Sequence, residues 1–526
     1  MKRIRLITAA CLLAASYPAA GQDGVRDFRQ VIENAPGLFL SNPAFLDAIQ
    51  GQIALVTLDA RKDNGGVIPL TESADSYRAG ASAEAYKRIS GKLSFHGKLD
   101  WHYSSGKDMG GQILMDPSYN PVNFLESTEE TMGRKHRESY TLEGGLSYNF
   151  GKRWAIGVKL DYQAADQTKV KDPRFSNIWM DIRLHSGVSF RPSEKWLFGL
   201  SFQYRNTLEQ VKGGVYGTTD RQYFVATDKG AFLGTVSQLD GDYNAIPVSS
   251  FRPMFNRFWG GSIQAVMNGK FASELWMLAR NGYYGRKSST TATFFEFNGF
   301  QIGYKSKLLI PGANQLHKLN WSIGMEMLTN RENKFRYVTP AGMNTIVEYL
   351  GQDIVLKRTQ ARARIAYVWE KGLDGFLPSF ILGASMESQL QSQQANLFPY
   401  TRTQRVLSAK ADVYATKNLR AGTSLFTLEI HLLGEGGGGT PLEDQVDPSA
   451  TSSSIKSFDS YLYRQYEYET APRAGVRIAF RWTFLSGGKL VPYIQMADEY
   501  LHLVSHPEYL KGSGRSSALL SIGCNF

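Results

Sequence analysis

Residues 93–104 read LSFHGKLDWHYS, and this stretch decides the fold. Apolar or small side chains occupy the odd positions, which are Leu93, Phe95, Gly97, Leu99, Trp101 and Tyr103. Polar side chains occupy the even positions, which are Ser94, His96, Lys98, Asp100, His102 and Ser104. Because successive side chains of a β-strand point to opposite faces, the stretch predicts a strand with one apolar and one polar face.

The same alternation recurs along the chain. It is clear in residues 140–150, 154–163, 178–191, 196–205, 319–327, 361–370, 380–386, 426–432, 476–484 and 518–526. It is less regular in residues 52–62, 77–88, 262–268, 273–283, 295–308, 405–414 and 490–498. We therefore expect an all-β protein of about 18 strands, with 16 or 20 as alternatives.

Strand length separates a membrane barrel from a soluble sandwich. Strands of soluble proteins average roughly 5 to 6 residues, whereas the regular stretches here keep their alternation for about 10 to 13. About 12 residues, tilted by about 40°, span about 30 Å, which covers the apolar band of an outer-membrane barrel. Aromatic residues at the ends of the apolar faces, such as Trp101 and Tyr103, favour the same interpretation. A secreted β-sandwich stays the alternative.

The connections between these strands alternate in length. Short turns are expected near Ser90, Gly151, Pro192, Gly269, Gly312, Gly375, Asn418 and Gly487, and long excursions at residues 105–137, 206–257 and 434–470. This asymmetry is typical of an antiparallel up-and-down transmembrane β-barrel, and no large plug domain is expected. The aromatic-rich excursion 206–257 either folds into the barrel or caps it from outside. The tract Gly434–Gly439 has the composition of a flexible linker.

The N-terminus has the three parts of a secretory signal peptide. A basic start with Lys2, Arg3 and Arg5 precedes an apolar run and the small residues Ala19, Ala20 and Gly21. We expect a signal peptide at residues 1–21, a periplasmic segment at 22–51 and a barrel at 52–526. Cys524 is then the only cysteine of the mature chain, so no intramolecular disulfide is expected. A net charge of +11 without a basic patch argues against nucleic-acid binding.

Two resemblances rest on short motifs. The terminal Phe526, preceded by Cys524, Ile522 and Leu520, resembles the C-terminal signal of Gram-negative outer-membrane β-barrels. This resemblance implies the cell outer membrane, recognition by the barrel-assembly machinery through Phe526, and contact with lipid and lipopolysaccharide. The sequence looks most like a barrel family of unknown function. Asn42-Pro43-Ala44 is similar to a motif of long-chain fatty acid transporter barrels; the alternative is a turn that leads into the first strand.

The polar faces of the expected strands give the candidate lumen. A water-filled lumen requires polar side chains on the inner face. The residues expected to line it are His96, Lys98, Asp100, Glu143, Lys159, Arg183, Arg205, Glu326, Arg362, Arg364, Glu429, Arg477 and Arg481. Arg362, Arg364, Arg477 and Arg481 predict a mild anion preference if the barrel brings them together.

The leading functional hypothesis is a passive channel or transporter for small solutes, with no cofactor. The alternative is an accessory subunit of an outer-membrane uptake or secretion complex that docks another outer-membrane protein through long external loops. An enzyme is disfavoured because no GxSxG, HExxH or P-loop motif occurs. His96 and His102 are expected about 20 Å apart along one strand, too far to share a metal ion.

Overall fold

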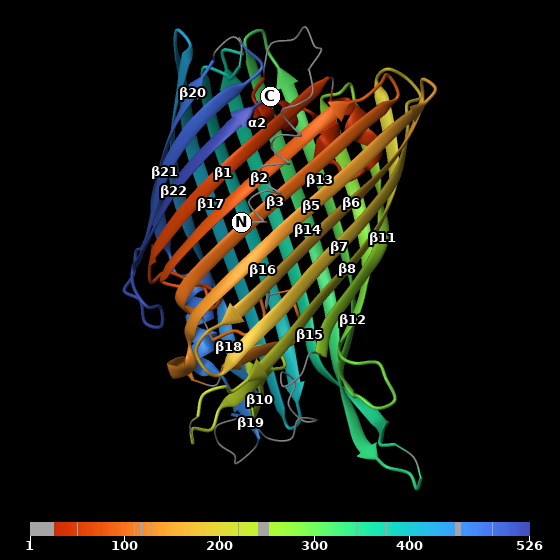
Figure 1. Cartoon of the computed structure of the whole chain (residues 1–526), viewed down its shortest axis with the longest axis vertical. Helices are drawn as coiled ribbons and strands as arrows, with labels where there is room; N and C mark the ends of the chain where they lie inside the picture. Colours follow the sequence, from red (N-terminus) through yellow and green to blue (C-terminus); the bar gives the residue numbers. More distant parts are fainter. Residues whose placement is uncertain are drawn as a thin grey trace.

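The computed structural model describes residues 26–526, except 50, 110, 116–118, 127, 219, 240–251, 343, 374–375, 448–453 and 486–487. It is dominated by one 18-stranded antiparallel sheet that closes into a barrel (Figure 1). The barrel strands are β1 (Gln52–Gly65), β2 (Asp75–Arg88), β3 (Leu93–Met109), β5 (Gly133–Phe150), β6 (Trp154–Lys169), β7 (Arg174–Phe190), β8 (Trp196–Gly214), β11 (Arg252–Met267), β12 (Phe271–Gly285), β13 (Thr293–Pro311), β14 (Gln315–Val338), β15 (Ile346–Lys371), β16 (Phe380–Leu397), β17 (Tyr400–Ala421), β18 (Ser424–Asp444), β20 (Arg473–Phe484), β21 (Val491–Leu503) and β22 (Gly514–Asn525). The predicted fold class and strand number are confirmed.

The first and last strands close the ring. β1 and β22 pair antiparallel, with Val56 opposite Cys524 and Leu58 opposite Ile522. The backbone of Phe526 exchanges two hydrogen bonds with that of Ala54. Every barrel strand therefore has two hydrogen-bonded neighbours, and the sheet has no open edge.

Alternation sorts side chains between the two faces of the wall. Outward-facing apolar residues are largely exposed, among them Leu200 at 57%, Ile323 at 60% and Leu432 at 63%. In β3, Phe95 faces outward, whereas His96 faces inward and is buried. A continuous exposed apolar surface of this kind is stable only against lipid or another apolar surface.

The strands extend further than the alternation predicted, so the connections are shorter. β14 and β15 contain 24 and 26 residues because they continue to pair beyond their neighbours. The turn expected near Asn418 lies at Gly422 instead, because Asn418 still pairs with Thr427. The turns expected near Gly375 and Gly487 lie outside the described residues.

The linker prediction for residues 434–439 was wrong. This tract belongs to β18, where Gly434 pairs with Ala411 and Gly439 pairs with Val406. Backbone hydrogen bonds to β17 hold a strand even where glycine supplies no side chain to pack.

The barrel has a short-turn end and a long-loop end. β1 begins and β22 ends at the short-turn end, which is uppermost in Figure 1. The N-terminal segment, here residues 28–49, lies inside this end and contains α2 (Phe28–Glu33) and the 3-10 helices η1 (Pro36–Phe39) and η2 (Pro43–Ala48). No helix among the described residues is long and apolar enough to cross a membrane. The expected signal peptide falls outside the described residues.

Inserted elements occupy the long-loop end. β4 (Asn123–Glu126), β9 (Phe224–Asp228), β10 (Leu233–Gln238) and β19 (Ile455–Ser457) form a small inner sheet, accompanied by η3 (Glu129–Thr131) and α3 (Asp459–Thr470). Phe124 and Val225 of this sheet are fully buried against Tyr284 and Phe295 of the barrel wall. The described part of the excursion 206–257 therefore folds inward, and the largest hydrophobic core lies inside the barrel.

Candidate functional site

The N-terminal segment touches the barrel wall on many sides. Asp27, the N-cap of α2, accepts a hydrogen bond of 3.1 Å from Arg481 of β20. Gln30 donates to Glu370 of β15 at 2.7 Å, and Asn525 of β22 accepts from the backbone of Phe28 at 2.9 Å. Because these contacts come from separated parts of the ring, the segment must lie inside the lumen.

Asn42 anchors the middle of this segment. Its side chain caps η2 by accepting from the backbone N–H of Ala44 at 2.9 Å. Its amide donates to the carbonyl oxygens of Val188 and Leu200, at 3.1 and 3.3 Å, and to Oε1 of Gln264 at 3.1 Å. The motif Asn42-Pro43-Ala44 thus begins a buried 3-10 helix against the inner wall and does not lead directly into β1.

Glycines on the wall make room for this anchor. A Cβ at Gly187 of β7 would lie 2.0 Å from Oδ1 of Asn42. A Cβ at Gly157 of β6 would lie 2.4 Å from the backbone nitrogen of Ala44. Both distances are far below a van der Waals contact, so only glycine permits this approach.

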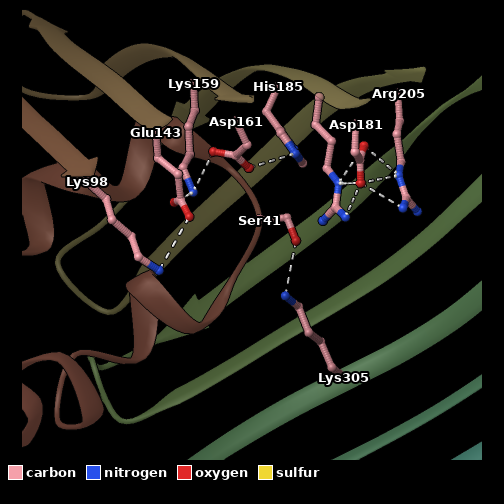
Figure 2. Close-up of polar contacts among 10 residues, drawn as sticks. Ser41, Lys98, Glu143, Lys159, Asp161, Asp181, His185, Arg205 and Lys305 are labelled. Carbon is pink, nitrogen blue, oxygen red and sulfur yellow. Dashed lines mark hydrogen bonds and ion pairs between the residues drawn. The ribbon is translucent and has the colours of Figure 1, made fainter. Parts of the chain in front are cut away.

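An ion-pair ladder runs across β3, β5, β6 and β7, the strands that η2 contacts (Figure 2). Glu143 of β5 binds Lys98 of β3 at 3.7 Å and Lys159 of β6 at 2.8 Å. Lys159 also binds Asp161 at 3.0 Å, and Asp161 lies 3.8 Å from His185 of β7. Alternating charges on neighbouring strands stabilise one another in this arrangement.

A second group continues the ladder. Asp181 of β7 is buried and accepts from Arg183 at 2.7 Å and from Arg205 of β8 at 2.8 Å (Figure 2). Further round the ring, Glu326 of β14 pairs with the fully buried Arg280 of β12. Paired charges of this kind rigidify the wall and leave few unpartnered ions on it.

The segment joins the charged wall at Ser41. Its hydroxyl accepts from Lys305 of β13 at 3.1 Å, and its backbone N–H donates to Glu274 of β12 at 2.9 Å (Figure 2). Lys305 and Glu274 are themselves an ion pair of 3.1 Å. The linker between η1 and η2 therefore rests on a preformed pair of opposite charges.

The remaining predicted lumenal residues lie in separate places. His96 contacts Glu84 at 3.1 Å, and Asp100 contacts His102 at 2.6 Å. Glu429 contacts His431 at 2.8 Å. The remaining three arginines are placed by the alternation of side chains along their strands. Arg362 and Arg364 share the inner face of β15 with Glu370 and are exposed, and Arg477 shares that of β20 with Arg481.

The four arginines expected to act together do not form one cluster. Arg362 and Arg364 lie on β15, Arg477 and Arg481 lie on β20, and β16, β17 and β18 separate them in the sheet. Arg481 is paired with Asp27. The condition for an anion preference from this set is not met, because strand order depends on the whole topology and not on local alternation.

Several buried charges were missed from the sequence. Lys318 pairs with Glu370 at 2.5 Å, and Arg402 pairs with Asp444 at 2.7 Å. Lys318 could have been found by extending the alternation of residues 319–327 by one position. Arg402 could not, because its other partners lie in inserted elements: the carbonyl oxygens of Ala231 and Phe232 and the hydroxyl of Ser457.

Two partly open cavities lie in the lumen at the long-loop end. One, of about 460 Å³, lies between the inner face of β1, β2, β3 and β5 and the loops above them. Another, of about 260 Å³, lies beside the inner sheet and shares Thr71, Gln112 and Met115 with the first. A third, of about 700 Å³, forms the mouth at the short-turn end. In the described part of the chain, no group of three His, Cys, Asp or Glu residues is placed to hold a metal ion.

The closed barrel has an apolar outer face and a charged, partly filled lumen. In these respects the chain resembles the barrels of outer-membrane transporters. The chain belongs to the family of unknown function DUF6850, whose family model matches residues 43–526. The expected resemblance to a barrel family of unknown function is thereby confirmed.

Solved outer-membrane proteins are similar in fold. The ferric preacinetobactin receptor BauA from Acinetobacter baumannii is 9% identical, with a TM-score of 0.37 over 91% of this chain and 80% of that chain. The ferric enterobactin receptor PfeA from Pseudomonas aeruginosa is 10% identical, with a TM-score of 0.41 over 90% and 80%. A mutant of the TodX monoaromatic hydrocarbon channel is 10% identical, with a TM-score of 0.29 over 92% of each chain. A comparison with curated proteins finds no match.

Proposed function

We propose that this protein resides in the outer membrane and passively transports a small polar solute through its lumen, with the N-terminal segment as the gate. The observation that carries the proposal is the position of residues 28–49 inside the short-turn end, because outer-membrane barrels have their short turns on the periplasmic side. The segment is anchored at Asn42 and at Asp27 by side-chain hydrogen bonds to the wall. A lumen lined by charged and amide groups suits a polar solute and not an apolar one.

The contacts of the segment suit reversible opening. A protein hydrogen bond contributes only about 1 kcal/mol net, because water replaces it when it breaks. Its buried apolar side chains lie in two clusters with the wall, Phe28, Leu46 and Ile49 with Tyr86, and Leu40 and Phe45 with Val266, and opening must break both. Lys305 keeps Glu274 as a partner within the wall when the segment leaves, whereas Arg481 loses Asp27.

Planar-bilayer conductance tests the gate. The full mature chain is compared with a variant that lacks residues 22–49, after both are shown to migrate as folded barrels without heating. We expect the deletion to raise single-channel conductance at least severalfold. Equal conductance of the two proteins would contradict the proposed gate.

A second candidate function is supported by the β14–β15 hairpin. β14 pairs with β13 only up to Glu332, and β15 pairs with β16 only from Leu356, so the hairpin projects alone beyond the ring. It is the teal hairpin at the lower right of Figure 1. Tyr349 and Leu350 are exposed on it. An accessory subunit of an outer-membrane complex would dock through such a surface.

Removal of the hairpin separates the two candidates. A variant with residues 335–349 replaced by a short glycine-serine turn should keep its conductance if the protein is a transporter. If the protein is instead an accessory subunit, the wild type stays electrically silent and co-purifies with one outer-membrane protein, and the hairpin variant loses that protein.

A further inference from the structure

The cavity of about 460 Å³ is lined by an excess of cationic side chains. These are Arg61, Arg78, Lys135, Arg137 and Arg515, together with His102. The acidic residues that line it are Asp63 and Glu72. The loop between β1 and β2 and residues 112–115 close the cavity toward the long-loop end. It is therefore a partly open, basic cavity of the size that holds small molecules.

The arginines follow one cross-strand row. Arg61 of β1 lies directly opposite Arg78 of β2, Arg78 lies opposite Ser104 of β3, and Ser104 lies opposite Arg137 of β5. Like charges directly opposite one another destabilise a sheet. Asp63 offsets the charge of Arg61, so the repulsion that a bound anion would relieve is centred on Arg78.

The carboxylates of the cavity are already engaged. Asp63 binds Arg61 at 2.8 Å and Arg515 at 3.4 Å, and it accepts from the hydroxyl of Ser517. Glu72 binds Arg515 at 2.7 Å.

Two further carboxylates lie just beside the cavity. Asp100 and Asp59 contact His102 at 2.6 and 3.7 Å. Arg78 forms no hydrogen bond or ion pair with any described residue, and its side chain is exposed to the lumen. Asp59 of β1 interacts electrostatically with Arg78 but forms no direct ion pair with it, so the Arg78 guanidinium keeps its hydrogen-bond donors for a ligand.

The uncharged lining consists of hydrogen-bonding groups. Hydroxyls of Ser76, Ser104 and Ser139 and the amides of Gln112 and Gln167 surround the arginine row. Guanidinium groups bind phosphate and carboxylate through paired hydrogen bonds, and hydroxyls and amides suit the hydroxyls of a sugar. We propose that this cavity binds a polyhydroxylated oxyanion of hexose size, such as a sugar phosphate. This inference rests on the proposed transport function and names its solute class.

Calorimetric titration of the detergent-solubilised full chain tests the site, with glucose 6-phosphate as the probe and glucose as the uncharged control. We expect glucose 6-phosphate to bind and glucose not to bind. Arg78→Gln should weaken binding at least tenfold, and Arg78→Lys should restore only part of it, because lysine keeps the charge without the planar fork. Arg362→Gln, which alters a lumenal arginine elsewhere, should leave binding unchanged.

Several results would overturn the inference. They are absence of binding by glucose 6-phosphate, equal binding of glucose, or unchanged affinity in Arg78→Gln. If Arg78→Gln does not assemble, wild-type affinity must still fall as NaCl is raised from 50 to 500 mM, as screening requires, and salt-independent binding would contradict the site.

The two proposals fail in different ways. If deletion of residues 22–49 raises conductance but glucose 6-phosphate does not bind, the proposed solute class is contradicted and the proposed gate stands. If glucose 6-phosphate binds but the deletion does not raise conductance, the proposed gate is contradicted and the proposed binding site stands.

Discussion

Asn42 combines the capping of one helix with the docking of the whole N-terminal segment. We predict that Asn42→Ala loosens the segment by about 1 to 3 kcal/mol, because it removes the N-cap and leaves buried carbonyl groups without a donor. Limited proteolysis in detergent should then cleave within residues 28–49 faster than in the wild type. Asn281→Ala, on the outer face of β12, is the matched control and should leave the rate unchanged.

Gly187 offers the same test from the wall side. Gly187→Ala places a methyl group against the anchor without altering the segment itself. We expect this variant to raise channel conductance toward that of the segment deletion. Gly144→Ala is the control, because a Cβ at Gly144 meets no atom within 4 Å. Conductance equal to wild type in Gly187→Ala would show that the wall tolerates the methyl group with the gate closed.

We predict that the stability of the inner sheet depends on pH through Asp228. Burial raises the pKa of its carboxyl to about 6, although the backbone N–H of Gly230 and the side chain of Asn123 favour the charged form. The folded state then binds the proton more tightly than the unfolded state, so stability is greatest below about pH 4 and is lost as pH rises through about 6.

Between pH 7 and pH 5 we expect the inner sheet to gain on the order of 1 kcal/mol from Asp228. Hydrogen exchange of residues 224–238, corrected for the intrinsic pH dependence of exchange, measures this gain. Asp228→Asn should remove it. A gain of the same size in that variant would assign the effect to another group.

Alternation predicts which face of a strand a residue lies on, as for Lys98, Glu143 and Lys159, but it does not predict the partners of that residue. That Glu143 binds both lysines follows from the register of β3, β5 and β6, which local sequence does not specify. Arg280 is buried against the carbonyl of Tyr119, from a loop that alternation cannot place.

At the scale of elements, the seam between β1 and β22 decides whether the barrel closes. We propose that Phe526 serves the assembly machinery as well as the seam. Phe526→Ala should lower the fraction of folded barrel in outer membranes, measured by heat-modifiable migration, because the recognised aromatic side chain is lost while its backbone pairs with Ala54 remain available. Phe484→Ala, an outward aromatic residue that ends β20, is the control and should assemble normally.

The ends of the strands are set by backbone hydrogen bonding between neighbouring strands more than by the pattern of side chains. All 18 barrel strands coincide with stretches expected from alternation, yet most extend beyond them. The glycine tract in β18 shows why: its ladder with β17 continues where no side-chain pattern exists. The inner strands β4, β9, β10 and β19 contain only 3 to 6 residues, too few for alternation to identify.

At the scale of the whole molecule, the sequence predicted the barrel but not the segments that fill its lumen. Antiparallel neighbours in sequence are neighbours in space, so strand count and closure follow from local patterns. The filling of the lumen arises from contacts between distant residues, such as Phe124 with Tyr284, and from a segment before the first strand. No period or motif specifies such contacts.

The N-terminal segment ends at residue 49 and β1 begins at Gln52, so the segment is tethered to the barrel by a short stretch of its own chain. Once displaced, the segment stays in a tiny volume near the mouth, where its local concentration is on the order of millimolar. Reclosure therefore needs no diffusing partner and is independent of how many copies populate the membrane. A free synthetic peptide of residues 28–49, added to the truncated barrel, should block current only near that same millimolar range.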